Sequence, residues 1–207
     1  MNANSEHERQ VFTVVRGGRP KASPVLMNLI RDTSTPVLIY MAERYGLRRV
    51  PGISRGDLVD RILRSLPAEA LDELLNDLIA ARYGSRSVEE LLGLVLLSDE
   101  QRLGRGKPRL DDMPAEDATL IQGGERRWLF TMHSHDVVID MSQRRLACGC
   151  PFFRFASYRH ALCKHLARAL TLIPETYARE ILIDLLVGRE YGGPDTPGWD
   201  FHSLRAA

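Results

Sequence analysis

The sequence is poor in cysteines and aromatic residues and has no excess of charge of either sign. Its 207 residues include three cysteines and 7% aromatic residues, and its net charge is +1 at pH 7. An odd set of three cysteines does not suit the disulfide framework of a secreted protein. A net charge close to zero also argues against a wholly basic or wholly acidic chain that binds through its overall charge.

Long apolar runs and familiar catalytic motifs are absent as well. No stretch has the length of a transmembrane helix, and the first ten residues are too polar for a secretory signal. The sequence has no phosphate-binding Gly-x-x-x-x-Gly-Lys-Ser/Thr loop, no Gly-x-Ser-x-Gly elbow and no His-Glu-x-x-His motif. We therefore expect a cytoplasmic protein that is not an enzyme and has no membrane or small-molecule partner.

All three cysteines fall in one short part of the chain. A Cys-Gly-Cys sequence begins at position 148, and a Cys-Lys-His sequence begins at position 163 after an interval of twelve residues. Side chains two residues apart in an extended segment share a face, and the glycine lets the backbone turn tightly around an ion. Three thiolates and one imidazole complete a tetrahedral zinc shell. The sequence therefore predicts one structural Zn²⁺ ion, bound by Cys148, Cys150, Cys163 and His165.

Other interpretations of these residues stay open. The cysteines could be ordinary buried residues beside a helical histidine. A redox role is disfavoured because Cys-x-Cys lacks the Cys-x-x-Cys spacing. A catalytic zinc ion needs an open coordination position, whereas four protein ligands fill the shell here. His160, His133 and His135 are either spare ligands or histidines of the surface.

The residues around the cysteines predict a small ββα module followed by a C-terminal helix. Alternating apolar residues, from Trp128 to Met132 and from Val137 to Met141, predict a β-hairpin or short meander before Cys148. Apolar residues at helical spacing between Leu162 and Ile173 predict a helix that has the second ligand pair in its first turn. A further helix is expected to begin at Pro174.

The run from Trp128 to Ala167 resembles a SWIM zinc finger, whose pattern is Cys-x-Cys, a variable spacer and Cys-x-His. The four ligand positions match this pattern, as do Pro151 after the second cysteine and Lys164 before the histidine. The resemblance covers residues 125–174 and implies a bound zinc ion with a DNA- or protein-interaction role. The family occurs in Swi/Snf-type ATPases, Mutator-like transposases and recombination mediators, so the fold alone does not define a function.

The charge of this segment is strongly uneven. Between Arg126 and Arg168 there are eight basic residues and two acidic residues, with several aromatic residues among them. Such a surface could contact phosphates and stack bases, or it could be a solvated arginine surface over a small aromatic core. The candidate nucleic-acid contacts in this segment are Arg144, Arg145, Arg154, Arg159, Lys164 and Arg168.

The N-terminal half predicts two helices joined by an extended connector. Thr35 and Pro36 favour the start of the first helix and Gly46 its end, while Ser54 and Asp57 form a capping-box-like start for the second. This pattern resembles a SAP domain, a small DNA-binding motif, although SAP domains often carry lysines at the start of the second helix. The contacts that the resemblance implies are Arg48, Arg49, Arg55, Arg61 and Arg64.

Together these observations predict an α+β protein in which an all-α, SAP-like cluster is joined by a linker to the ββα zinc module. The expected parts are a mobile basic arm at 1–33, the helical SAP-like region at 34–98, a charged linker at 99–125, the SWIM-type zinc finger at 126–174, and a C-terminal helix and tail at 175–207. We expect a zinc-containing, DNA-binding accessory factor in recombination, repair, transposition or transcription. The alternative is an adaptor whose SWIM module recruits a recombinase or an ATPase.

Overall fold

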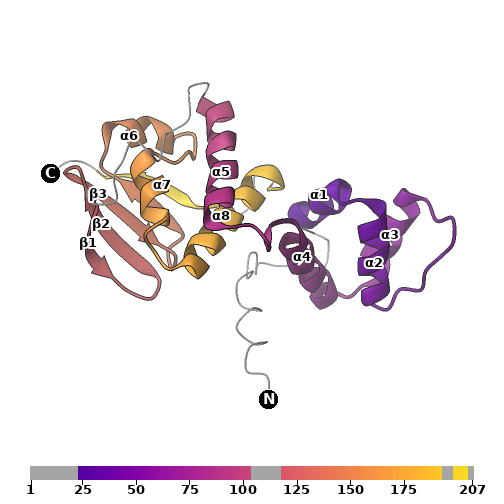
Figure 1. Ribbon diagram of the computed structural model, residues 1–207. Coiled ribbons are helices and arrows are strands. Elements are labelled where there is room, and N and C mark those ends of the chain that lie inside the picture. Colours follow the sequence, from indigo (N-terminus) through magenta and orange to yellow (C-terminus); the bar gives the residue numbers. More distant parts are fainter. Residues whose placement is uncertain (1–22, 104–117, 193–197, 205–207) are drawn as a thin grey trace, which may run out of the picture. The chain divides into compact units, whose positions relative to one another are not determined.

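The computed structural model describes residues 23–103, 118–192 and 198–204 and divides the chain into two compact units (Figure 1). The first unit consists of Met1–Ser85 and Val187–Pro197, and the second consists of Arg86–Leu186 and Gly198–Ala207. The predicted α+β class is confirmed, since helices in the N-terminal part are followed by a small sheet and by C-terminal helices. The sequence had assigned α5, which belongs to the second unit, to the N-terminal cluster.

In its described residues, the first unit contains four complete helices and the end of α8 (Glu175–Glu190). The complete helices are α1 (Pro24–Asp32), α2 (Thr35–Arg44), α3 (Arg55–Ser65) and α4 (Ala68–Tyr83). Helix α1 packs against α4 and α2 packs against α3, with a core of leucine and isoleucine side chains such as Leu29, Ile62 and Ile79. Burying each such side chain contributes about 1.5–3 kcal/mol, which makes this core the main source of the unit's stability.

Helix α1 corrects the expectation of a mobile arm over residues 1–33. The Ser23 side chain caps it by accepting a hydrogen bond from the backbone N–H of Leu26 (3.2 Å), and proline stands in its first turn. Its apolar face, which includes Val25 and Ile30, is buried. A cap, a well-placed proline and a buried face are sufficient to order a short helix. The remainder of the expected arm, residues 1–22, lies outside the described residues.

The predicted pair of helices with an extended connector is confirmed. Helix α2 ends before Gly46, whose φ of +80° is a left-handed conformation that favours glycine. At the start of α3, the Ser54 hydroxyl accepts a hydrogen bond from the Asp57 N–H (3.1 Å) and donates one to the Asp57 carboxylate (2.7 Å). This reciprocal cap is the physical reason why α3 begins where the sequence predicted.

In the part that the structure describes, the second unit combines one sheet with four helices. Its strands are β1 (Ala118–Gly123), β2 (Arg127–Met132), β3 (His135–Asp140), β4 (Arg145–Cys148) and β5 (Asp200–Ser203), in the spatial order β1-β2-β3-β4-β5. The strands pair antiparallel except for β4 and β5, which are parallel. Its helices are α5 (Val88–Leu103), α6 (Pro151–Ser157), α7 (Lys164–Leu170) and α8 (Glu175–Glu190), of which α8 contributes its residues from Val187 onward to the first unit.

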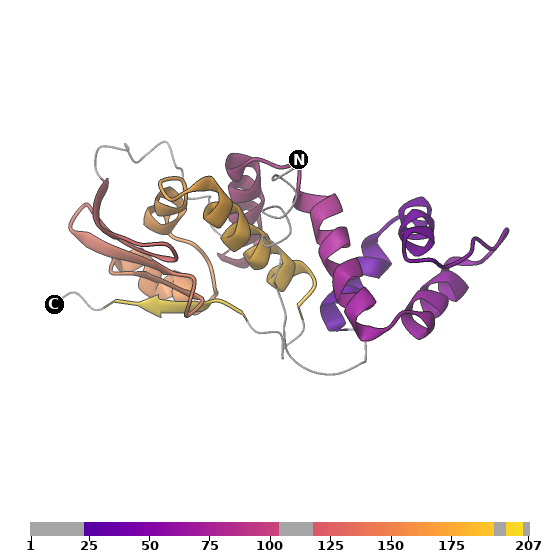
Figure 2. The same cartoon turned by 90° about the horizontal axis from the view of Figure 1, so that it is seen from below.

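The five-stranded sheet extends the predicted ββα module. The predicted meander is confirmed as β2-β3-β4, whereas neither outer strand was expected (Figure 2). Strand β1 lies in the expected linker at 99–125, as does the last part of α5, so this segment is not a simple linker. Most β1 side chains are exposed, so neither face of this strand needs apolar residues. Its sequence therefore lacks the alternation of apolar and polar residues that would have indicated a strand.

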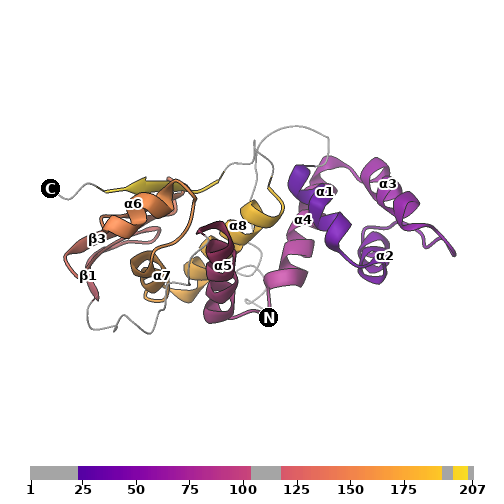
Figure 3. The same ribbon diagram turned by 90° about the horizontal axis from the view of Figure 1, so that it is seen from above.

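The helices after the sheet cover the region in which the cysteines lie. Helix α6 packs beside β5, and α7 packs on β3 and β4 (Figure 3). The ring of Phe153 from α6 stacks on that of Phe201 from β5, with centroids 6.2 Å apart. Within the described ranges, no helix combines the length and the apolar character that crossing a membrane requires.

Candidate metal centre

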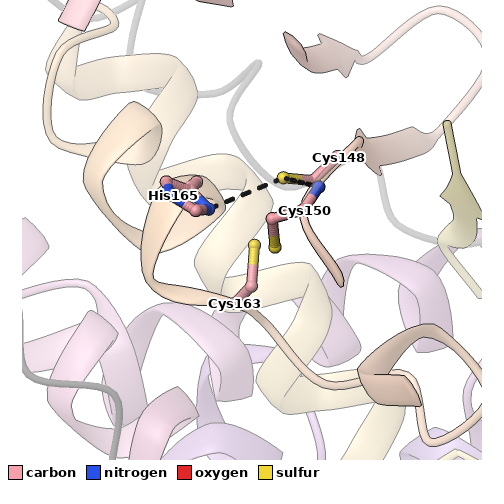
Figure 4. A group of neighbouring side chains, drawn as sticks. All are labelled: Cys148, Cys150, Cys163 and His165. Atoms are coloured by element: carbon pink, nitrogen blue, oxygen red, sulfur yellow. Dashed lines mark hydrogen bonds between the residues drawn. The ribbon is translucent and has the colours of Figure 1, made fainter. Parts of the chain in front are cut away.

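The four predicted metal ligands come together where β4 meets the starts of α6 and α7 (Figure 4). Cys148 is the last residue of β4, and Cys150 and Cys163 are the N-cap residues of α6 and α7. His165 lies in the first turn of α7. Twelve intervening residues therefore make one short helix and a return loop, which brings the second ligand pair back to the first.

The geometry of this cluster suits a single metal ion. The four donor atoms all lie within 4.8 Å of one another, and Cys148 Sγ is 3.8 Å from His165 Nδ1. A tetrahedral zinc shell with Zn–S bonds of about 2.3 Å places its ligand atoms roughly 3.5–3.8 Å apart. All four residues are buried, so water does not compete freely for the donors. This Cys₃His cluster could hold one metal ion.

Backbone N–H groups surround the three sulfur atoms. The N–H of Cys150 donates to Cys148 Sγ (3.4 Å), that of Phe153 to Cys150 Sγ (3.3 Å), and that of Leu166 to Cys163 Sγ (3.5 Å). Each sulfur thus accepts one backbone hydrogen bond. Such bonds favour the thiolate over the thiol, because they stabilise its negative charge.

The three thiols cannot all ionise easily on their own. Hydrogen bonds with Cys148 and Cys163 hold the pKa of Cys150 well below its usual range. The hydrogen bond with Cys150 raises the pKa of Cys148 to about 12, and burial raises the pKa of Cys163. The protein groups alone therefore stabilise one negative charge, whereas a bound dication would allow all three sulfurs to bind as thiolates.

A buried aspartate holds the loop in front of Cys163. Asp99 on α5 is fully buried, and its Oδ2 accepts a hydrogen bond from the backbone N–H of Leu162 at 2.8 Å. Sequence analysis missed this residue because it stands at the start of the expected linker. One signal was present, since Asp99 follows the buried residues Leu92, Val95 and Leu96 at helical spacing.

The three histidines considered as spare ligands lie outside the cluster. Within the described residues, the group able to hold a metal consists of Cys148, Cys150, Cys163 and His165 alone. The rings of His133 and His135 lie edge-on to that of His165, with centroids 6.3 and 5.2 Å away. The exposed His160 ring lies against that of Phe201 instead, at 5.3 Å.

In the first unit, the structure brings together three of the five arginines that the SAP resemblance implied. Arg48, Arg49 and Arg61 line one shallow hollow of the surface beside α2 and α3. Arg55 points elsewhere, because its guanidinium donates to the carbonyls of Ile30 (2.8 Å) and Arg31 (2.7 Å) at the end of α1. The exposed Arg64 pairs with Asp60 on its own helix. The distance of that ion pair is 3.1 Å.

In the second unit, several candidate arginines have partners within the fold. Arg144 pairs with the buried Asp184 (3.0 Å) and lies over the Trp199 ring, and Arg145 pairs with Asp200 (3.0 Å). The half-buried Arg168 donates to the Thr171 hydroxyl (3.4 Å). The remaining three candidates are exposed on or next to α6 and α7. They are Arg154, Arg159 and Lys164.

Comparisons with models of protein families, with curated proteins and with solved structures give no significant match to this chain. The resemblances to the SWIM and SAP families therefore consist of local residue patterns.

Proposed function

We propose that the Cys₃His cluster binds one structural Zn²⁺ ion and that the protein is a non-catalytic, nucleic-acid-binding accessory factor. Zinc fits the donor set, because thiolate and imidazole ligands in a closed tetrahedral arrangement are typical of structural zinc sites. Four protein ligands leave no coordination position for a substrate or an activated water. The ion would stabilise the second unit rather than take part in a reaction.

The charge around the ligands is the observation that carries the nucleic-acid proposal. Residues 148–174 contain no aspartate or glutamate. Their four basic side chains are Arg154, Arg159, Lys164 and Arg168. Three thiolates and one Zn²⁺ ion contribute a net charge of about −1, so the metal-loaded segment stays basic. A basic segment favours a polyanionic partner, and nucleic acid is the polyanion that the SWIM resemblance implies.

The hollow beside α2 and α3 would add a second basic surface. Its lining holds three arginines against one carboxylate, Glu43, together with apolar side chains such as Val50, which is exposed, and Leu58. Two basic surfaces on one chain raise the affinity for a long polyanion when both engage it at once. This arrangement fits a factor that binds DNA without strong sequence preference during recombination, repair, transposition or transcription.

A salt-dependent titration tests the proposal. Fluorescence anisotropy of labelled, mixed-sequence DNA would be recorded with zinc-loaded protein at 50 and 200 mM salt. We expect micromolar or tighter binding that weakens steeply with salt, because each neutralised phosphate releases a counterion. Replacing Arg48, Arg49 and Arg61 together by alanine should reduce the slope of log K against log salt by about 2–3 for duplex DNA.

The matched control is Arg64→Ala, which removes an exposed arginine that is paired with Asp60 on the same helix. This variant should bind DNA like the unchanged protein. Failure to bind any DNA at 50 mM salt, with one zinc ion per chain confirmed, would overturn the proposal.

The edge of the sheet favours a second candidate, a protein-docking adaptor. Strand β1 forms one edge of the described sheet, and its Leu120 and Ile121 side chains are 53% and 58% exposed. An exposed edge strand with apolar side chains can pair with a strand of another protein, such as a recombinase or an ATPase. Binding to such a partner would respond little to salt, which distinguishes it from DNA binding.

A further inference from the structure

The solvent face of α6 carries three aromatic side chains in a row. Phe152, Phe155 and Tyr158 follow one another at intervals of three residues, so they lie along one side of the helix. Their exposed fractions are 39%, 42% and 83%. The buried side of α6 is formed instead by Phe153, Ala156 and Ser157.

Basic side chains flank these rings. The guanidinium of Arg159 lies over the Phe155 ring, 5.2 Å from its centroid. Arg154, which lies between Phe152 and Phe155 in α6, is exposed and forms no ion pair with another residue in the described part of the chain. No acidic residue occurs between Cys148 and Pro174. The α6 surface, defined as Phe152, Arg154, Phe155, Tyr158 and Arg159, is therefore both aromatic and cationic.

We infer that the α6 surface is a stacking platform for single-stranded nucleic acid. Exposed rings offer faces on which unpaired bases can stack, and the flanking cations neutralise the phosphates between those bases. Bases in a duplex are already stacked on one another, so the rings would add little to duplex binding. The inference rests on the proposed function and refines it, because it names the strand state of the nucleic acid and the surface that binds it.

The metal cluster would hold this platform in place. Cys150 is the N-cap residue of α6, and its sulfur accepts the hydrogen bond from the N–H of Phe153. On its inner side, Phe153 stacks on Phe201 of β5. The platform is thus attached to the sheet on one side and to a proposed zinc ligand at its N-cap. Rigid placement of the rings lowers the entropy lost when bases stack on them.

Three labelled probes of matched length and base order test the inference. They are a single-stranded DNA, a single-stranded RNA and the corresponding duplex DNA, titrated with zinc-loaded full-length protein at one low salt concentration. The decisive variant is Tyr158→Ala, because this side chain is 83% exposed and its loss leaves the core intact. Its matched control is Tyr40→Ala, an equally simple change at a tyrosine that is 62% exposed on α2.

We expect Tyr158→Ala to weaken single-strand binding by about fivefold to a hundredfold, and Tyr158→Trp to preserve it. The affinity of Tyr158→Ala for the duplex should change by less than twofold. The affinities of Tyr40→Ala for all three probes should also change by less than twofold. The DNA and RNA probes show which single strand is preferred, and a preference for either supports the inference. Zinc content and the melting curve of each variant confirm that it is folded.

Two other outcomes would contradict the platform, and they differ in what they imply for the proposed function. Binding that favours the duplex and is unchanged in Tyr158→Ala would overturn the platform while leaving the proposed function in place. Absence of binding to all three probes, with one zinc ion per chain, would overturn both proposals.

Discussion

The Asp99 carboxylate accepts a hydrogen bond from the backbone N–H of Leu162, and this bond joins α5 to the loop that presents Cys163. The two residues are 63 positions apart, and both are fully buried. A buried N–H without an acceptor costs about 1–3 kcal/mol, so the position of this loop depends on a carboxylate from another element. Asp99 therefore helps to position the loop that presents Cys163 to the Cys₃His cluster.

Replacing Asp99 tests this dependence. Asp99→Leu removes the acceptor, whereas Asp99→Asn keeps an oxygen in the same place. We expect the leucine variant to bind zinc about tenfold to a hundredfold more weakly, the range found when partners of metal ligands are removed. The asparagine variant should lose less. Competition with a chromophoric chelator measures both affinities, and Glu89→Gln, at an exposed position on α5, is the control. Equal affinities in all variants would show that the bond has no role in zinc binding.

Loss of a ligand should unfold the second unit and spare the first. His165→Ala and Cys150→Ala each remove one donor of the buried cluster, and the free energy of zinc binding is also folding free energy. Hydrogen exchange followed by mass spectrometry should show lost protection in β2 to α7, with α1 to α4 still protected. His160→Ala, which removes an exposed histidine outside the cluster, should keep one zinc ion per chain. A Cys150→Ala protein with full zinc content and an unchanged melting curve would rule out the assigned ligand set.

The Arg144–Asp184 pair predicts a pH dependence of stability. Burial raises the pKa of Asp184 to about 6, against the opposing influence of Arg144. The folded state thus holds the proton more tightly than the unfolded chain, in which an aspartate pKa is about 3.9. Stability from this group is present below about pH 4 and is lost as the pH rises to about 6.

Asp184→Asn should remove this pH dependence. Relative to the unchanged protein, its free energy of unfolding should rise by up to about 3 kcal/mol between pH 4 and pH 6. Denaturant titrations of both zinc-loaded proteins across this range measure the difference, and effects of pH on the metal ligands cancel because the two proteins share them. A difference that stays constant with pH would contradict the prediction.

Two glycines should respond to alanine in opposite directions. Gly93 lies inside α5, and a Cβ added there meets open space. Gly93→Ala should stabilise the second unit by about 0.5–1 kcal/mol, because alanine loses less backbone entropy in a helix. Gly46→Ala should destabilise the first unit by about 1–2 kcal/mol, because its φ of +80° is unfavourable for residues with a Cβ. Denaturation monitored separately in each unit, by hydrogen exchange, gives both values.

The elements that sequence analysis predicted correctly depend on local interactions. Helix α3 begins with a reciprocal cap between Ser54 and Asp57, residues three apart. Strands β2 and β3 alternate buried and less buried residues along most of their length, a period-2 pattern visible in the sequence. The ligand set was also predictable, because thiolate donors two residues apart can face one ion, whatever the rest of the fold does.

The roles of the long basic side chains could not be predicted in the same way. Arg55 was expected to contact DNA, but it binds the carbonyls at the end of α1, 24 and 25 positions away in sequence. Arg144 likewise reaches Asp184 on α8. An arginine side chain is long enough to find partners from several elements, so its neighbours in sequence do not reveal which of them it binds.

By itself, the sequence determined the members of the Cys₃His cluster, the main helix starts and the central strands, because each of these depends on residues close together in the chain. Only the tertiary structure decided the outer strands β1 and β5, the attachment of Asp99 to the metal loop and the exposure of the α6 aromatics. These features depend on pairing and burial between segments far apart in the chain. No local pattern of residues encodes such long-range contacts, which form only when the chain folds.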